Sequence, residues 1–160
     1  MVATQIAAYA SYYQPGITKI YIVATMANYL SPTRAELDAG LDVTRQVRSI
    51  DGWAVEAEQL ERPDMNSTFN SKIGGRTNAA DSSLTFYLAQ NGTDIRTTLT
   101  QGWAGFVVFL DGGDVATRRM DVFPATVISR PKQRGDDAPF TGMYQFSVTQ
   151  PPAEDVTIPA

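Results

Sequence analysis

Three short motifs in this sequence carry side chains that could bind an ion or take part in catalysis. Asp111-Gly112-Gly113-Asp114 places two carboxylates on a glycine-containing segment, as a calcium loop does. Asp136-Asp137 is a carboxylate pair, and paired carboxylates are the catalytic groups of most glycosidases. Lys72-Ile73-Gly74-Gly75-Arg76 combines cations with glycines, a composition suited to phosphate. Each of these chemistries also requires a particular spacing of its residues.

None of the three motifs has the required spacing. A calcium loop needs more oxygen ligands than residues 111–114 supply, so a hairpin turn is predicted there. Adjacent acids on a polar loop lack separate environments for an acid and a base, so a solvated loop is favoured at 136–137. Residues 72–76 do not lie between a strand and a helix, as a phosphate-binding loop does, and are predicted to be a flexible loop.

The composition removes most other catalytic chemistry. The 160 residues include no cysteine and no histidine, so disulfides, thiolate metal sites, imidazole-based triads and ordinary zinc sites cannot form. An enzyme would have to gather its acids in one pocket without any imidazole. The sequence therefore predicts a protein that is not an enzyme and that uses no cofactor and no metal.

Length and charge set further limits. A chain of 160 residues suits one domain, predicted over residues 1–160. The 13 basic and 17 acidic residues give a net charge of -4, which opposes tight binding to nucleic-acid phosphates. No segment approaches the roughly 20 apolar residues that a membrane-spanning helix requires. The lack of cysteine is typical of a protein that assembles in a reducing cytoplasm.

Alternating and continuous apolar segments predict a mainly β domain, either a sandwich or a partly closed barrel. Residues 19–24 are rich in β-branched and aromatic side chains, and residues 84–88 and 144–148 alternate between apolar and other side chains. Residues 104–110 form a continuous apolar run, typical of a strand covered on both faces. Pro124 removes a hydrogen-bond donor, so its strand is predicted to be bent, bulged or at an edge.

Two helices are predicted between the strands. The more conspicuous one covers residues 93–101, where Thr93 suits the cap position. A second, shorter helix is predicted over residues 33–39, because Thr33 and Glu36 have the spacing of a capping box.

Residues 42–60 are predicted to form two strands around an Asp51-Gly52 hairpin turn. Alternation then separates the side chains into two faces. The apolar face comprises Val43, Val47, Trp53, Val55 and Ala57. The polar face comprises Thr44, Gln46, Arg48, Glu56 and Glu58, as expected of a surface that meets water.

Residues 61–81 show neither the helical nor the strand period. A structureless insertion of this length inside a compact domain is usually functional, or it orders only when it meets a partner. Its apolar residues are isolated along the sequence. Residues 150–160 contain several prolines and are predicted to form an extended C-terminal tail.

The order of several segments points to a family. These segments are YYQPGITKIYIV near the amino terminus, SPTRAELDAG from Ser31, KIGGRTNAADSSLTF from Lys72, the GTDIR helix start, the GFVVFLDGGD strand and turn, MDVFP from Met120, and PPAEDVTIPA at the end. Together they resemble the major tail tube protein of long-tailed, siphovirus-type bacteriophages. The resemblance covers nearly the whole chain.

The resemblance implies a structural virion protein. Six copies would form a ring, and rings would stack into a tail tube whose inner sheets join into one barrel. Double-stranded DNA would pass through this conduit during ejection without sequence-specific contacts. The implied partners are other copies of the chain and the tail tape measure, tail tip and tail terminator proteins. The tail would be assembled in the host cytoplasm.

The resemblance also suggests roles for two sets of residues. In the family, an extended loop of this kind reaches the neighbouring ring, which assigns inter-ring contact to residues 61–81. The residues concerned are Met65, Phe69, Lys72, Ile73 and Arg76. The polar face of residues 42–60 is the candidate for the channel lining, and it consists of Thr44, Gln46, Arg48, Glu56 and Glu58. A plain surface loop is the alternative for residues 61–81.

Other functions are also compatible with the sequence. A tail terminator and the inner tube of a contractile injection device share the general fold by resemblance. Self-stacking would separate a tube protein from a terminator, and a sheath encoded nearby would indicate a contractile system. A monomeric β-sandwich binding module would gather its aromatic side chains in one exposed cleft and would run as a single species on sizing.

Overall fold

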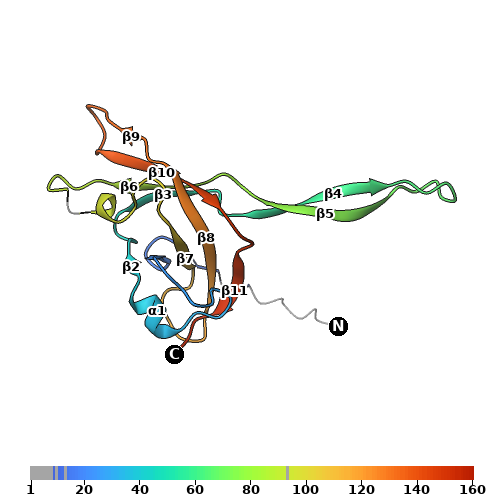
Figure 1. The fold of residues 1–160 in the computed structure, drawn as a ribbon, viewed down its shortest axis with the longest axis horizontal. Coiled ribbons are helices and arrows are strands. Elements are labelled where there is room, and N and C mark those ends of the chain that lie inside the picture. Colours follow the sequence, from blue (N-terminus) through green and yellow to red (C-terminus); the bar gives the residue numbers. More distant parts are fainter. Residues whose placement is uncertain (1–8, 10, 13, 93) are drawn as a thin grey trace, which may run out of the picture.

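Figure 1 shows the computed structural model, which describes residues 9, 11–12, 14–92 and 94–160. The predicted mainly β fold is confirmed. The elements in chain order are β1 (Lys19–Val23), α1 (Arg34–Asp38), β2 (Leu41–Asp42), β3 (Val47–Asp51), β4 (Val55–Arg62), β5 (Ser71–Ala79), β6 (Ser82–Tyr87), the 3-10 helix η1 (Ile95–Thr97), β7 (Ala104–Leu110), β8 (Arg119–Ser129), β9 (Lys132–Gln133), β10 (Thr141–Val148) and β11 (Ala153–Thr157).

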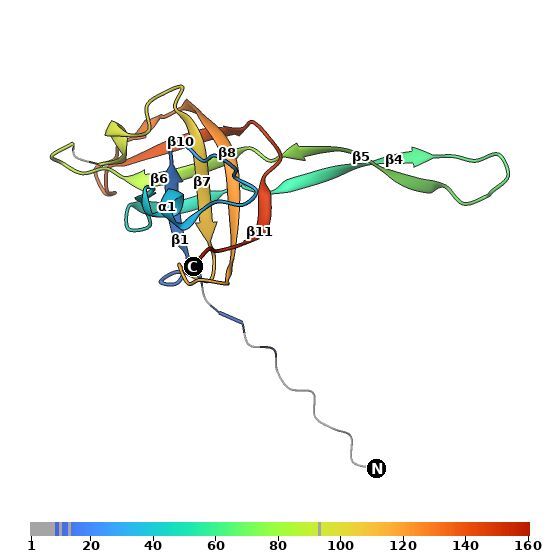
Figure 2. The same cartoon turned by 60° about the horizontal axis from the view of Figure 1, so that its bottom comes forward.

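The described strands form two antiparallel sheets. The larger sheet has nine strands in the order β2-β1-β7-β8-β10-β6-β3, with β11 added beside β8 and β9 beside β10. It curls into the body of the molecule, and the β4–β5 pair projects from this body (Figures 1 and 2). Because the end strands β2 and β3 do not pair with each other, the sheet is not closed.

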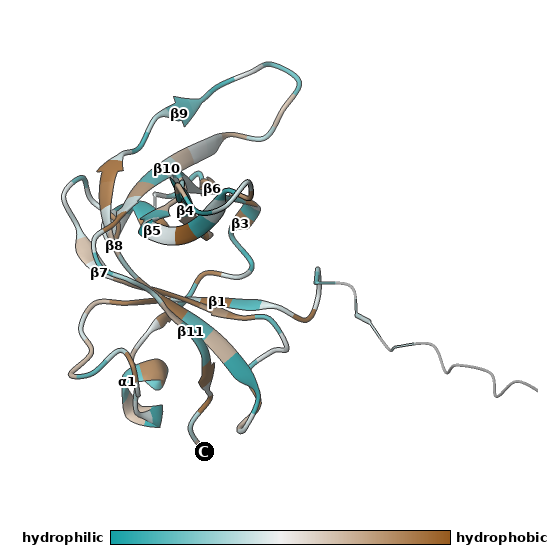
Figure 3. Cartoon of the chain, turned by 90° about the vertical axis from the view of Figure 1, so that its right-hand side faces the viewer, coloured by the Kyte–Doolittle hydropathy of each residue, from teal (hydrophilic) through white to brown (hydrophobic). Residues whose placement is uncertain are grey.

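The central strands bury side chains on both faces, as predicted for residues 104–110. In β7, Val107 and Phe109 belong to one core cluster, whereas Val108 and Leu110 belong to another. The first cluster lies inside the curled sheet and collects residues from β1, β6, β7, β8 and β10. The second is covered by α1 and the C-terminal segment, which lie on the same side of the body (Figure 3).

Pro124 lies where β8 changes its partner. On one side, β8 pairs with β7 along residues 121–126, and Pro124 is opposite Phe106. On its other side, β8 pairs with β11 up to Val122 and with β10 from Ala125 onward. Pro124, which has no N–H, therefore lies in the gap between the β11 pairing and the β10 pairing, so its missing donor costs neither of these ladders a hydrogen bond. The prediction of a bend, a bulge or an edge strand is therefore not confirmed, because β8 is an interior strand and its register with β7 is unbroken through Pro124.

The two predicted helices had different outcomes. The shorter one is confirmed as α1, and Thr33 and Glu36 form its capping box, in which Thr33 N donates to Glu36 Oε2 over 2.7 Å. The helix predicted over residues 93–101 is wrong, because only η1 forms there. Its N-cap is Asp94, whereas Thr93 lies outside the described residues. Threonines at 97, 98 and 100 disfavour a longer helix because they are β-branched.

The predicted hairpin at Asp51-Gly52 is also wrong. Strand β3 pairs with β6, and β4 pairs with β5, so the strands on either side of this dipeptide are not partners. Gly52 and Trp53 both have positive φ, 78° and 58°. Two successive residues in this conformation turn the chain out of the body sheet and into the β4–β5 pair.

The segment predicted to be structureless, residues 61–81, contains regular structure. Strand β4 continues to Arg62, and Ser71–Ala79 forms β5. The prediction failed because the strand period is visible only when one face is buried, and both faces of this hairpin are exposed. The C-terminal tail is extended as predicted, but it also contributes β11, which pairs with β8.

Candidate functional site

The β4–β5 hairpin, residues 55–79, is here called the arm (Figures 1 and 2). Within its two strands, every residue except Val55 and Gly75 is exposed. A two-stranded hairpin is marginally stable alone in water, and each of its outer edges presents unpaired backbone groups. The arm is therefore the part of the described structure best suited to contact another chain.

The strand register divides the arm side chains into two faces. Leu60 is opposite Ile73, and Glu61 is opposite Lys72, so successive residue pairs face opposite sides. The β4 side chains on the face with Leu60 are Glu56, Glu58 and Arg62. A bulge lies between Ala57 and Gln59, and such bulges increase the twist of a strand pair.

The tip of the arm, residues 63–70, presents two large apolar side chains to solvent. Met65 is 104% exposed and Phe69 is 76% exposed. Local hydrogen bonds shape the tip, since Asn66 N donates to Asp64 Oδ1 and Phe69 N donates to Ser67 Oγ, each over 3.0 Å. A tip shaped by local bonds around exposed apolar groups is suited to a protein interface.

The root of the arm is fixed to the body by Trp53. Its backbone N–H donates to Ser82 Oγ over 3.2 Å, and its indole Nε1–H donates to the Ser83 carbonyl over 3.1 Å. The indole ring also packs inside the body, with ring-centroid distances of 5.1 Å to Phe109, 5.3 Å to Phe123 and 5.2 Å to Phe146. These contacts join the arm root to β7, β8 and β10.

Gly52 is required beside Trp53. A Cβ atom at this position would collide with the Asp81 carbonyl and would lie 2.9 Å from Ser82 Cα. The backbone just after β3 therefore lies against the backbone between β5 and β6, and at residue 52 only glycine fits.

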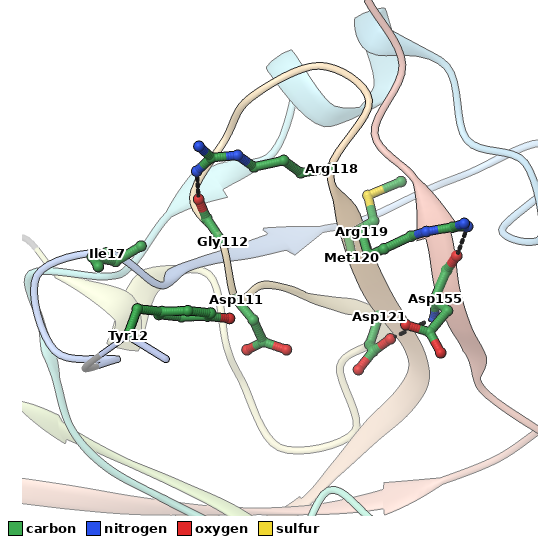
Figure 4. Close-up of a pocket in the computed structure, with 9 residues that line it drawn as sticks. All are labelled: Tyr12, Ile17, Asp111, Gly112, Arg118, Arg119, Met120, Asp121 and Asp155. Atoms are coloured by element: carbon green, nitrogen blue, oxygen red, sulfur yellow. Dashed lines mark hydrogen bonds between the residues drawn. The ribbon is translucent and has the colours of Figure 1, made fainter. Parts of the chain in front are cut away.

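A second feature of the surface is a cavity of about 620 Å³ between the β7–β8 turn and β11 (Figure 4). Its acids are Asp111, Asp121 and Asp155. Asp121 Oδ1 accepts from Asp155 N over 2.7 Å, and burial, with the Asp121 carboxylate nearby, raises the pKa of Asp111. The cavity therefore disfavours a further negative charge.

Both arginines that line this cavity donate hydrogen bonds to backbone carbonyl oxygens. Arg118 donates to the Gly112 carbonyl, and Arg119 Nη1 donates to the Asp155 carbonyl over 2.7 Å (Figure 4). No group of three or more acids placed to hold a metal ion occurs among the residues that the structure describes.

The three motifs considered first have other structural roles. Asp111-Gly112-Gly113-Asp114 is at the β7–β8 turn, as predicted, and Asp114 pairs with Arg34 on α1. Asp136 and Asp137 are exposed on the loop after β9, also as predicted. Residues 72–76 lie within β5 instead of a flexible loop.

Comparison with known proteins identifies the family. A family model described as phage tail tube protein matches residues 6–160. The chain belongs to the phage tail tube protein family. It is a structural protein of the virion tail, as the sequence resemblance predicted. No curated protein sequence matched the chain.

Solved structures share the tail tube fold. One chain in the six-fold symmetrised baseplate of the anti-feeding prophage is 10% identical, with 91% of this chain and 95% of that chain covered and a TM-score of 0.58. One chain in the sheath/tube terminator of PVC, an extracellular contractile injection system in its extended state, is 11% identical, with coverage of 89% and 96% and a TM-score of 0.62. At these identities the likeness establishes the fold alone.

The residues predicted to line the tube channel do not form one sheet face. Glu56 and Glu58 are exposed on the arm, and Arg48 is exposed on β3. Thr44 Oγ1 accepts from Ile20 N over 3.0 Å, and Gln46 Oε1 accepts from Ile95 N over 3.2 Å. The last two therefore stabilise the body, and they are separated from the arm by the Gly52–Trp53 turn.

The residues predicted to contact the neighbouring ring all lie on the arm. Met65 and Phe69 are at the tip, and Lys72, Ile73 and Arg76 are exposed on β5. Sequence reasoning missed the importance of Trp53 for the arm, although a tryptophan directly after Asp-Gly was a visible signal. No helix of the described residues is long and apolar enough to cross a membrane.

Proposed function

We propose that this protein builds the tail tube itself. Six copies form a ring, rings stack on one another, and the hollow stack is the conduit through which the genome passes into the host. Residues 1–160 act as one tail tube domain with the arm and the C-terminal segment as extensions. The observation that carries the proposal is the arm: a chain of the tail tube protein family has a long hairpin in which almost every residue is exposed.

Stacking of rings would explain the exposed apolar side chains and the strand edges of the arm, which would have no role in a monomer. Contact with the next ring would cover the exposed side chains of Leu60, Met65, Phe69 and Ile73. A neighbouring copy would also pair with the free edges of β4, β5 and the end strand β3. Because the arm and its partner surface differ, the contact is head-to-tail, and such contacts generate open filaments.

The channel lining is assigned to the root half of the arm. Glu56 and Glu58 are exposed close to the body, whereas the tip lies at the far end of the arm (Figure 1). Six copies of a chain with charge -4 carry a charge of -24. A negative lining repels DNA phosphates, so the genome would slide without adhering to the wall. Thr44, Gln46 and Arg48 lie on the body side of the Gly52–Trp53 turn, so the proposed lining is limited to Glu56 and Glu58.

The remaining partners follow from a role in the tail. The tape measure protein would occupy the tube during assembly. The tail tip protein would start the growth of the tube, and the terminator would end it. Assembly would take place in the host cytoplasm, and the protein would need no catalytic group.

A second candidate function is favoured by the solved structures. Of the two similar chains described above, one comes from the sheath/tube terminator of an extracellular contractile injection system and the other from the baseplate of the anti-feeding prophage. A terminator would form a single ring at the end of a tube, and an inner tube would copurify with a sheath protein. The number of stacked rings therefore distinguishes a tube protein from a terminator.

Removal of the arm tests the proposal. Val55 and Ala79 are paired, so residues 56–78 can be replaced by Asn-Gly, a dipeptide whose turn matches the twist of paired strands. We expect a folded body that forms rings but sediments without tube-sized particles. The matched control is Asp136→Asn with Asp137→Asn, which alters an exposed loop and should leave tubes intact. Tubes of normal length without the arm would contradict the role of the arm in stacking.

A further inference from the structure

A cleft of about 380 Å³ opens at the end of the body sheet, between residues 14–20 and β3. Pro15, Ile20, Val47 and Ile50 give it an apolar lining, and Ile50 is 43% exposed. Among the described residues that line it, Arg48 is the only charged one. The cleft is therefore an apolar recess with one positive charge at its wall.

Backbone groups beside this cleft also lack a strand partner. Strand β3 pairs with β6 on one side and ends the strand order of the sheet, so its other side has no strand against it in the part of the chain that the structure describes. A segment entering the cleft can form backbone hydrogen bonds there as well as apolar contacts.

The arm tip has the complementary composition. It carries two apolar side chains, Met65 and Phe69, and its one charged residue is Asp64. Arg48 and Asp64 take part in none of the ion pairs found among the described residues. Two apolar groups with one negative charge thus match an apolar recess with one positive charge.

The larger cavity shown in Figure 4 is a poorer match for the tip. Its three acids outnumber its arginines, and both arginines donate to carbonyl oxygens of their own chain. Asp64 would approach the carboxylates of Asp111 and Asp121, which are already close enough to raise the pKa of Asp111. Charge complementarity therefore favours the cleft beside β3 over the larger cavity as the contact site for the arm tip.

We propose that the cleft between residues 14–20 and β3 receives the arm tip of a second copy of this chain, with Met65 and Phe69 against Ile50 and Val47, and with Asp64 beside Arg48. This inference rests on the proposed stacking of rings and names the surface that the arm contacts. The contact between tip and cleft would also fix the rotation of one ring relative to the next, since each tip enters one cleft.

Engineered cysteines test this contact directly, because the natural chain contains none. Thr68→Cys places a thiol on the tip, and Ser49→Cys places one at the cleft. A chain with both changes, assembled and then mildly oxidised, should give a ladder of covalent multimers, because each link joins the tip of one copy to the cleft of another. Disulfides form only when the two Cα atoms come within about 7 Å, so the link reports close contact.

Controls separate this inference from the stacking proposal. Each single variant should give no ladder, and Thr68→Cys with Tyr12→Cys, which places the second thiol at the larger cavity, should also give none. Tubes that form normally but show no tip-to-cleft ladder would overturn the inference and leave stacking intact. Failure of the unmodified protein to form tubes would instead overturn the stacking proposal.

A charge exchange provides an independent test. Arg48→Glu and Asp64→Lys should each raise the protein concentration needed for tubes to form, because each places like charges together. The double variant should return this concentration toward the wild-type value. A double variant that assembles no better than the worse single variant would contradict the proposed pairing.

Discussion

Arg34 on α1 holds the carboxylate of Asp114, in the turn after β7, with two parallel hydrogen bonds. Nη1 lies 2.6 Å from Oδ1, and Nη2 lies 2.8 Å from Oδ2. Tyr21 on β1 also donates its hydroxyl to Oδ2, over 2.8 Å. Because the Asp114 side chain is only 11% exposed, this pair fastens the helix to the central strands beneath it.

We predict that this contact makes stability depend on pH. The hydrogen bonds from Arg34, together with that from Tyr21, lower the pKa of Asp114 to about 2, although its partial burial opposes the shift. A carboxylate with a lowered folded-state pKa stabilises the protein above its unfolded pKa of about 4. This stabilisation is lost as pH falls through about 2.

Asp114→Asn tests the prediction. At pH 7 the substitution should lower the free energy of unfolding by about 2 kcal/mol, and the difference from wild type should shrink between about pH 4 and pH 2. Denaturant unfolding across this range measures it. Asp38→Asn is the control, because that carboxylate also pairs with Arg34 but is 58% exposed, so a much smaller effect is expected. Equal effects of the two substitutions would contradict the assignment.

Gly52→Ala should destabilise the protein more than Gly102→Ala does. Both glycines have positive φ, 78° and 83°, so both substitutions impose backbone strain of about 1 kcal/mol. Only at Gly52 does the new Cβ meet the backbone of residues 81 and 82, whereas nothing lies within 4 Å of it at Gly102. Thermal unfolding of the two variants compares the effects. A similar loss at both positions would show that close packing at the arm root has no role.

Trp53 should prove essential to the arm root. Trp53→Ala removes the ring from among three phenylalanines, and we expect a loss of about 3 kcal/mol or more. Trp53→Phe keeps an aromatic ring but loses the hydrogen bond to the Ser83 carbonyl, so a loss of about 1 kcal/mol is expected. Hydrogen exchange of residues 55–79 would follow the arm itself. Unchanged protection in Trp53→Ala would contradict the anchoring role.

Neutralising Glu56 and Glu58 should make tubes retain DNA. If these side chains line the channel, Glu56→Gln with Glu58→Gln removes twelve negative charges per six-membered ring and weakens the repulsion of phosphates. Binding of short duplex DNA to purified tubes at low salt measures the effect, because salt screens it. Asp136→Asn with Asp137→Asn changes the charge equally on the exposed loop after β9. Equal binding by both variants would place Glu56 and Glu58 elsewhere.

Much of the body could be predicted from the sequence because its signals are local. The apolar run of β7 and the Thr33–Glu36 capping box each express a rule that operates within a few residues. The nine-stranded order could not be predicted, because it depends on contacts between distant segments.

The arm shows why the site was harder to predict. Asp51-Gly52 has the local chemistry of a hairpin turn, but packing of Trp53 against Phe109, Phe123 and Phe146 directs the chain outward at that point. The polar strands beyond it bury neither face, so their alternation carries no apolar signal. Family resemblance suggested inter-ring contact for residues 61–81, which stays a proposal, whereas the residues alone left a plain surface loop as the alternative.

Cryo-electron microscopy of the purified, concentrated protein tests the tail tube proposal most directly. We predict hollow tubes of stacked six-fold rings, with each arm extending from one ring to the next. A sample that stays monomeric, even when tail tip components are added, would contradict the proposal and would favour a monomeric binding module.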